Sequence, residues 1–530
     1  MPGTGWLRDS LIYQIFVPSF ADGDGDGIGD LKGVVAHLDH LQWLGVDAIW
    51  FNPCFASPFR DAGYDVADYL SIAPRYGTNE EMIALIAEAR RRGIRVLLDL
   101  VAGHTSVAHP WFQASANDPA DERYVWSDTP GPGFVPGPGT RQGYYLKNFF
   151  DEQPALNFGY ARLDEHEPWR QAVDAPGPTA NRQALCEVMA YWLDRGVAGF
   201  RVDMAYSLVK DDFDFAATVD LWAALRAWVE ARYPDAVVIP ENDYRLAPGM
   251  GARAGFDADF FLVIEQAHSL LFNNGGAGVL ATLPDHRACY FDAGAPSPDA
   301  TFGAFLRQWE DHQSGSGGQR LVVLPTADHD FSRLATAPRT TEQLGAAYAF
   351  LLTWGSIPSI YYGDEIGMRY LLGLPEREGS KWSPGFNRAG CRTPMQWDDD
   401  LPDVGFSTAP AEHLYLPQDP DPARPTVAAQ RAAAQSPLRR IRRLVELRRA
   451  TPELRPGPDT TVLSPGYPLV YLRGDRHLVV VNPASTARSA TIPALEGRTA
   501  RALEVSGIHV ASELVTADPF GYGVFLLERR

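Results

Sequence analysis

Three carboxylates and one arginine, each close behind a short apolar run, are the side chains of this sequence best suited to catalysis. The run 197–202 predicts a buried strand that carries Arg201 and Asp203 to its carboxyl end, on the same side because side chains alternate along a strand. Glu241 and Asp330 follow further apolar runs. An arginine favours the charged form of a neighbouring carboxylate. We therefore expect Asp203 to be ionised and Glu241, with no cation beside it in the sequence, to carry a proton.

A charged carboxylate beside a protonated one is the arrangement that cleaves a glycosidic bond with retention of configuration, at a separation of about 5 Å. We expect Asp203 to be the nucleophile and Glu241 the acid/base. Asp330 would polarise substrate hydroxyls and stabilise the positively charged transition state. Tyr64 offers an aromatic surface for a sugar ring. Other polar residues expected at the same rim are Asp65, Asp99, His104 and His329.

The elements that must position these residues alternate between strands and helices. Apolar runs that predict strands occur at 11–18, 48–51, 95–100, 197–202, 237–240, 256–262, 321–325 and 359–362. Helical patterns occur at 31–44, 79–92, 181–195, 219–232, 344–352 and 437–449. This α/β alternation predicts a closed (β/α)8 TIM barrel, in which catalytic groups lie at the carboxyl ends of the strands.

The alternation is interrupted once and stops before the end of the chain. Residues 104–167 are rich in proline, glycine and aromatic residues, and they are too many for a plain loop, so we expect an inserted lobe after strand 3. Short β runs separated by glycine and proline predict a C-terminal antiparallel β-sandwich. The predicted domains are the barrel at 1–103 and 168–450, the lobe at 104–167 and the sandwich at 451–530.

An acidic, glycine-rich loop near the N-terminus has the spacing of a calcium site. Asp22, Asp24, Asp26 and Asp30 stand at relative positions 1, 3, 5 and 9, and Ile28 supplies a backbone carbonyl at position 7. Position 12 lacks the glutamate of an EF-hand, so we expect a structural Ca²⁺ loop and not a calcium sensor. The alternative is a solvated acidic turn.

Composition narrows the range of partners. The net charge of −19 argues against nucleic acid and anionic membranes as ligands, and leaves a neutral small molecule such as an oligosaccharide. No apolar run approaches the roughly 20 residues of a membrane span, and the N-terminal residues lack the pattern of a signal peptide. The four cysteines are scattered, which favours free thiols in a cytoplasmic protein.

The order of these motifs resembles the α-amylase superfamily, glycoside hydrolase family 13, over essentially the whole chain. The matching segments are 45–53, 99–104, 153–157 in the predicted lobe, 199–203, Glu241 and 329–330. The resemblance implies that Asp203, Glu241 and Asp330 are the nucleophile, the acid/base and the transition-state stabiliser. It also implies a glucose subsite lined by Tyr64, His104, Arg201 and His329.

Two further segments, 60–64 and 391–397, resemble the oligo-α-glucosidase and trehalose synthase branches. In the oligo-α-glucosidase branch, the residues matching Asp61 and Arg392 bind the terminal sugar, which implies attack from the non-reducing end. The 22–30 loop also matches these branches, where it binds calcium. The chain departs from the family motifs at three positions: Gly103 and Asp328 replace asparagine, and Met204 follows the nucleophile where alanine or valine is usual.

The sequence therefore predicts a retaining α-glucosidase that hydrolyses short α-glucans, of the α-1,4 malto-oligosaccharide type, through a covalent glycosyl-enzyme on Asp203. The alternative is a transglycosylase or isomerase of the trehalose synthase type, which would convert maltose to trehalose. Both share the glycosyl-enzyme and differ in whether water or a sugar hydroxyl attacks it. A non-catalytic binding module is a third hypothesis, which the intact carboxylates disfavour.

Overall fold

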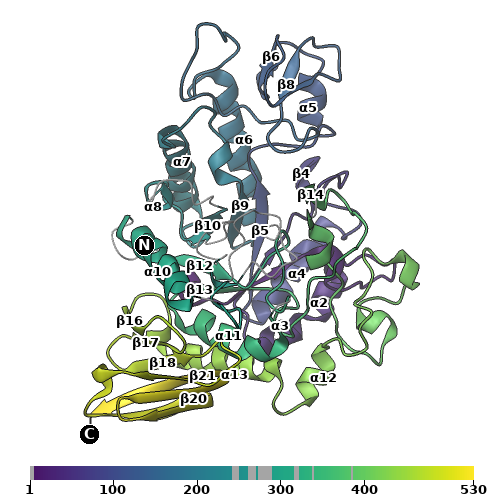
Figure 1. The fold of residues 1–530 in the computed structure, drawn as a ribbon. Coiled ribbons are helices and arrows are strands. Elements are labelled where there is room, and N and C mark those ends of the chain that lie inside the picture. The colour runs from purple at the N-terminus through teal and green to yellow at the C-terminus, as the bar shows by residue number, and fades with distance from the viewer. Residues whose placement is uncertain are drawn as a thin grey trace.

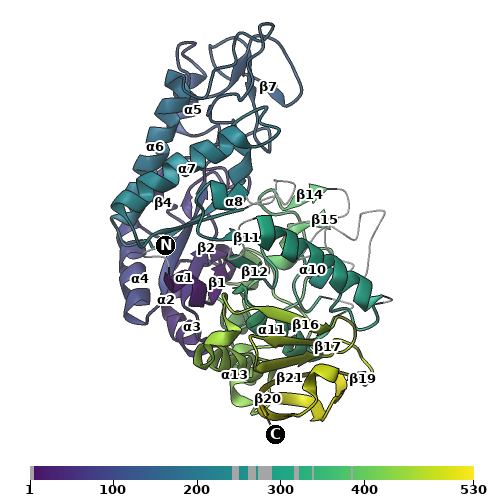
Figure 2. The ribbon, with the colours of Figure 1, turned by 90° about the vertical axis from the view of Figure 1, so that its left-hand side faces the viewer.

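The computed structural model describes residues 5–241, 250–260, 270–272, 289–295, 297–315, 321–336, 339–383 and 386–529. Three parts lie along its long axis: a lobe containing β6–β8, a central barrel, and a C-terminal sheet at the opposite end (Figure 1). The view turned by 90° shows the same arrangement, with the lobe above α6 and α7 (Figure 2). Among the described residues, no helix combines the length and the hydropathy needed to cross a bilayer.

Eight parallel strands form the barrel, in the order β10-β9-β5-β2-β1-β13-β12-β11. A parallel bridge between Glu241 and Phe260 joins the two ends of this order and closes the barrel. Nearly every strand residue is buried, as expected where helices cover a parallel sheet. The strands are β1 Ile12–Ile15, β2 Ala48–Phe51, β5 Arg95–Val101, β9 Gly199–Asp203, β10 Val237–Pro240, β11 Asp259–Phe260, β12 Val322–Pro325 and β13 Ile357–Tyr361.

The structure thus confirms the predicted TIM barrel, with differences at particular elements. The predicted helix 31–44 is split at His37, whose backbone leaves the helical region, into α2 and α3. Of the predicted strand 256–262, β11 covers the last two described residues; 261 and 262 lie outside the described residues. The helices are α1 Gly5–Asp9, α2 Leu31–Ala36, α3 Leu38–Leu44, α4 Asn79–Arg91, α6 Pro176–Leu193, α7 Ala216–Arg232, α8 Met250–Arg253, α11 Leu344–Thr353, α12 Val427–Ala432 and α13 Pro437–Ala450.

One long helix, α10 (Pro298–Gly315), was not predicted. Its apolar residues Phe302, Phe305, Leu306 and Trp309 recur at intervals of three and four, and the first two are fully buried. This spacing is the helical signal that would have revealed it.

The lobe contains the helix α5 (Pro110–Ser115) and a three-stranded antiparallel sheet. Its core is aromatic, with Phe112 packed against Tyr124, Trp126 and Tyr145. Single bridges, such as that between His104 and Ala155, tie it to the barrel rim. The lobe strands are β6 Trp126–Ser127, β7 Phe134–Pro136 and β8 Tyr144–Leu146; two hairpins at the rim are β3 Phe55–Ala56 with β4 Asp68–Ile72, and β14 Lys381–Ser383 with β15 Phe386–Asn387.

The C-terminal strands form one six-stranded antiparallel sheet below α11 and α13 (Figure 1). One face of the sheet, which includes Tyr471, Val479 and Val524, joins the core of the barrel, and the other face has its own apolar cluster. The exact domain boundaries remain a prediction. The strands are β16 Thr460–Ser464, β17 Leu469–Arg473, β18 His477–Val481, β19 Arg488–Thr491, β20 Arg498–Ala511 and β21 Leu514–Arg529.

Candidate active site

Arg201 lies at the centre of a cluster of carboxylates at the carboxyl ends of three adjacent strands. Strand register places it beside Asp99 of β5. Its Nη1 donates to both Asp99 oxygens, at 2.9 and 3.1 Å, and to Asp203 Oδ1 at 3.2 Å. Its Nη2 pairs with Glu241 Oε2 at 3.0 Å. One guanidinium therefore holds the predicted nucleophile and acid/base next to each other, as a retaining mechanism requires.

The expectation that no cation accompanies Glu241 is wrong. The chain places no cation next to Glu241, but the barrel brings Arg201 in from the adjacent strand β9. The backbone N–H of Met204 also donates to Glu241 Oε2, at 2.9 Å. Met204 has φ 40° and ψ 45°, a left-handed conformation that is strained for a residue with a side chain. This strain, directly after the nucleophile, aims the N–H at Glu241.

The electrostatics of the pair also differ from the expectation that Arg201 keeps Asp203 charged. Burial raises the pKa of Asp203 well above its ordinary value, and the charge of Glu241 raises it further against the opposing effect of Arg201. Burial likewise raises the pKa of Asp99, to about 6, although Arg201 opposes it. Three carboxylates share one guanidinium, and burial opposes the charged forms of Asp203 and Asp99.

Tyr64 and His329 form a stacked pair beside this cluster. Their rings are parallel within 8° at 5.3 Å between centroids. The Tyr64 hydroxyl donates to Asp99 Oδ2 at 3.0 Å and accepts from Asn52 Nδ2 at 3.1 Å. The amide nitrogens of Gln14 and Asn52 lie 3.0 and 3.1 Å from His329 Nδ1, so this atom accepts and the ring proton is on Nε2.

Asp330 is held in the charged form. Its Oδ2 lies 3.2 Å from His329 Nε2, and its Oδ1 contacts Arg388 Nη1 at 2.8 Å and Arg392 Nη2 at 3.1 Å. Burial alone would raise the pKa of Asp330, but His329, Arg388 and Arg392 outweigh it and lower the pKa below its ordinary value. A permanent negative charge at this position suits the predicted stabilisation of a cationic transition state.

Of the two residues expected to bind the terminal sugar, Asp61 forms its ion pair with Arg388, and Arg392 pairs with Asp330. Arg388 Nη2 lies 2.9 Å from Asp61 Oδ1, and Gln153 of the lobe donates to Asp61 Oδ2 at 2.8 Å. Arg392 is instead fully buried, donates from Nε to the His329 carbonyl at 2.8 Å and packs over the Phe16 ring. The two arginines are one helical turn apart in the chain, and only the tertiary structure shows which one faces Asp61.

His104 is buried behind Tyr64, and its Nε2 lies 3.1 Å from the Tyr64 carbonyl oxygen. Burial lowers the pKa of His104 to about 3, so the ring is neutral. Asn148 of the lobe contacts the other ring nitrogen at 3.0 Å. Gln153, Asn148 and Arg388 were not identified from the sequence as individual site residues, although Gln153 belongs to the matching lobe segment.

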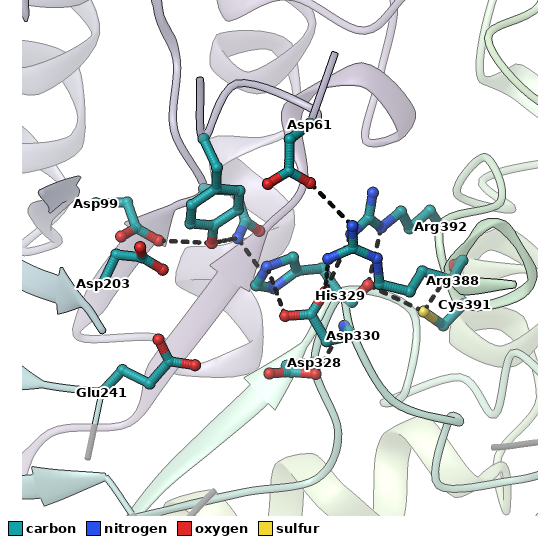
Figure 3. A network of polar contacts seen from close by, with 12 residues as sticks. Asp61, Asp99, Asp203, Glu241, Asp328, His329, Asp330, Arg388, Cys391 and Arg392 are labelled. Carbon is teal, nitrogen blue, oxygen red and sulfur yellow. Dashed lines mark hydrogen bonds and ion pairs between the residues drawn. The ribbon is translucent and has the colours of Figure 1, made fainter. Parts of the chain in front are cut away.

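Figure 3 shows the arrangement that results. The carboxyl groups of Asp203, Glu241 and Asp330 lie around a common space, although they stand at or after the carboxyl ends of three different strands. Asp61 and Arg388 lie on the opposite side of His329 from Glu241. The three predicted catalytic carboxylates therefore meet in one place, with Asp330 held charged and with Asp203 and Glu241 bound to the same guanidinium.

The acidic loop also brings carboxylates together, away from this site. Oxygen atoms of Asp22, Asp24 and Asp30 lie within 4.8 Å of one another, which could hold a metal ion. Asp26 is not part of this cluster; its Oδ1 accepts from the Ile28 N–H at 2.8 Å. Burial, followed in part by the charges of Asp24 and Asp22, raises the pKa of Asp30. Like charges in a partly buried cluster fit a cation with oxygen ligands.

The chain is similar to known proteins along most of its length. The family model of the alpha-amylase catalytic domain matches residues 14–245 and 295–457. Trehalose synthase/amylase TreS of Mycobacterium tuberculosis is 31% identical over 503 residues, covering 84% of this chain and 76% of that protein. A probable alpha-glucosidase of Rhizobium meliloti is 31% identical over 543 residues, covering 93% and 92%.

Solved structures with a similar fold point to the same family. The trehalulose synthase MutB from Pseudomonas mesoacidophila MX-45 has a TM-score of 0.79 and 25% identity to this chain, covering 99% of it and 100% of MutB. Another MutB structure, a mutant with a TM-score of 0.80, is a complex with the substrate sucrose. With the fold, the three carboxylates and the match over most of the barrel in agreement, the chain belongs to the alpha-amylase family, glycoside hydrolase family 13, and is an enzyme that acts on glucosides.

Proposed function

We propose that the protein is a retaining α-glucosidase that hydrolyses short α-glucans, of the α-1,4 malto-oligosaccharide type, from the non-reducing end. Asp203 attacks the anomeric carbon while Glu241 gives its proton to the departing oxygen. The result is a covalent glycosyl-enzyme on Asp203. Glu241 then takes a proton from water, which attacks the same carbon and releases the sugar with its original α configuration.

Arg201 contributes in both steps. It binds Asp203 and Glu241 through different nitrogens, so it keeps the two carboxyl groups in place while charge moves between them. Formation of the glycosyl-enzyme removes the negative charge of Asp203. Repulsion within the pair is then relieved, and Glu241 becomes able to act as a base in its charged form. Asp330 remains charged throughout and stabilises the cationic character of the sugar in both transition states.

Attack from the non-reducing end is supported above all by the Asp61–Arg388 ion pair. Glu241 protonates the leaving-group oxygen, so the leaving group lies on its side of the bond. Asp61 and Arg388 lie across the site from Glu241, and Arg388 is tied to Asp330 as well. Gln153 fixes Asp61 from the lobe. We expect an ion pair on this side to close the site beyond one terminal sugar.

A transglycosylase or isomerase of the trehalose synthase type is the second candidate. It is favoured by the similarity to TreS of Mycobacterium tuberculosis and to the trehalulose synthase MutB. Chromatography of the products from maltose, isomaltose, trehalose, sucrose and soluble starch separates the two. Glucose as the product from maltose, with no trehalose and no longer oligomer, is the expected result. Trehalose as the main product would replace hydrolysis by isomerisation.

We further propose that the acidic cluster of Asp22, Asp24 and Asp30 holds a structural Ca²⁺. Support comes from the three converging carboxylates and from the Ile28 carbonyl in the same loop, since hard cations prefer oxygen ligands.

We also propose a cytoplasmic location. The four cysteines are free thiols, which supports it.

A further inference from the structure

Gly103, next to His104, leaves a space that a neighbouring segment fills. A Cβ atom at position 103 would lie 2.7 Å from Ser207 Oγ and 2.9 Å from Asn148 Nδ2, closer than such atoms approach in proteins. The backbone of Gly103 is not in the left-handed region, so its conformation would accept any residue. A side chain at position 103 would therefore have to displace the ends of Ser207 and Asn148, and the amide of Asn148 from the lobe lies in the space that glycine leaves.

The orientation of the Asn148 amide is fixed by its neighbours. Lys210 Nζ, which can only donate hydrogen bonds, lies 2.9 Å from Asn148 Oδ1. The amide NH2 therefore faces the other way, where its nitrogen lies 3.0 Å from His104 Nδ1 and 3.2 Å from Ser207 Oγ. Lys210 also donates to the Ser207 carbonyl. Lys210 therefore links the Asn148 amide to the segment after β9.

This orientation determines the protonation of His104. Because the amide donates to Nδ1, that nitrogen accepts, and the single proton of the neutral ring lies on Nε2. Nε2–H then donates to the Tyr64 carbonyl, at 3.1 Å. At the far end of the same residue, the Tyr64 hydroxyl donates to Asp99, which pairs with Arg201. Asn148 and His104 thus contact the backbone of the residue whose side chain reaches the Asp99–Arg201 pair.

We propose that Asn148 is a positioning residue, which sets the tautomer and orientation of His104 by occupying the space left by Gly103. In this chain the inserted lobe supplies the supporting amide, and Lys210 and Ser207 hold it. The inference rests on the proposed glucoside cleavage for its effect on rates, but not for its effect on His104 itself. It makes the lobe a direct part of the catalytic support.

The sharpest variant is Asn148→Asp, which has the same shape and keeps the contact to Lys210. It presents an acceptor to His104 Nδ1 in place of a donor, so His104 must move its proton or become charged. We expect kcat/KM on the best substrate to fall by about tenfold, the weight of one or two hydrogen bonds, with the melting temperature unchanged or higher. Asn148→Ala should lower kcat/KM by about five- to tenfold.

An exchange of the two positions tests the use of the space. Gly103→Asn alone should clash with Asn148 and lower activity more than Asn148→Gly alone. The double variant Gly103→Asn/Asn148→Gly should recover activity above both single variants. Asn117→Ala is the matched control, because Asn117 is an asparagine of the same lobe whose amide contacts Gln113 and Thr140 only within the lobe. It should leave kcat and KM unchanged.

A readout that does not depend on turnover separates this inference from the proposed function. In protein labelled with ¹⁵N-histidine, the signals lost in His104→Gln identify His104, and their shifts report which nitrogen carries the proton. We expect a protonated Nε2 and a bare Nδ1 in the wild type, and a changed pattern in Asn148→Asp. An unchanged His104 spectrum in Asn148→Asp overturns the inference, whatever the substrate proves to be. Wild-type kcat/KM in both Asn148 variants would overturn it as well.

Discussion

Asp328 should destabilise the folded protein at neutral pH, because it is a buried carboxyl group with an incomplete set of partners. It is fully buried; its Oδ1 accepts from the Asp330 N–H at 2.8 Å, and among the described residues its Oδ2 has no hydrogen-bond partner. Burial, and next the charge of Asp330, raises the pKa of Asp328 well above its ordinary value. The folded state therefore binds this proton more tightly than the unfolded chain, whose aspartates have a pKa of about 3.9.

The sign of the pH effect follows from this linkage. Protonated Asp328 contributes to the free energy of unfolding. This contribution is fully present below the pKa of the unfolded chain and is lost as the pH rises through the raised pKa of the folded state. Asp328→Asn keeps an oxygen for the Asp330 N–H and removes the buried ionisable group. We expect it to stabilise the protein by about 1–3 kcal/mol at pH 8, because the folded wild type must there either hold this proton or bury a charge, and by nothing at pH 4, where the carboxyl group is neutral in the folded state.

Asp330→Asn is the matched control. It lies two residues away, and its expected effect on stability is opposite, a loss instead of a gain. The pKa of Asp330 is lowered by His329, Arg388 and Arg392, so its contribution is present above the unfolded pKa and is lost as the pH falls through the folded pKa. Removing this charge takes away an anion that pairs with the buried guanidinium groups of both Arg388 and Arg392. We expect a loss of about 3–5 kcal/mol at pH 7, the range found when a buried ion pair is broken.

The assay is urea unfolding followed by tryptophan fluorescence at several pH values between 4 and 8. The comparison is between denaturation midpoints, because a protein of three parts need not unfold in one step. An Asp328→Asn variant that is less stable than the wild type at pH 8 would refute the assignment of a raised pKa. A gain of equal size at pH 4 and pH 8 would refute it too, since the effect would then not come from ionisation.

Three further outcomes are expected. Glu241→Gln should lower kcat on maltose by about 10²- to 10⁴-fold, as for loss of a general acid, and Asp203→Ala should abolish turnover with the melting temperature preserved; unchanged rates in either variant would exclude the mechanism. Arg388→Ala should raise activity on longer malto-oligosaccharides relative to maltose by opening the closed end, and an unchanged ratio measured by chromatography would remove that role. A chelator should lower the melting temperature of the wild type but not of Asp24→Asn, and elemental analysis that finds no calcium in the purified wild type would exclude the metal.

Local pattern was sufficient for the barrel and for the positions of the three carboxylates. Strands of a parallel sheet are apolar throughout, so each is visible in the sequence, and the polar residue that ends it is visible as well. Asp203, Glu241 and Asp330 could be placed at one rim because all strands of a TIM barrel point the same way. The helix α10 and the break at His37 were missed, the first because its signal was overlooked and the second because it depends on one residue's backbone.

Periodicity and spacing along the chain are enough to predict the family of folds, the order of the catalytic residues and the acidic loop. The contacts of these residues depend on long-range packing: Arg201 lies beside Glu241, Arg388 and not Arg392 pairs with Asp61, and Asn148 lies in the space at Gly103. Each pair joins segments that are distant in sequence, so barrel closure and loop packing set their contacts. Burial, which the chain acquires only on folding, then determines which carboxyl groups keep their protons.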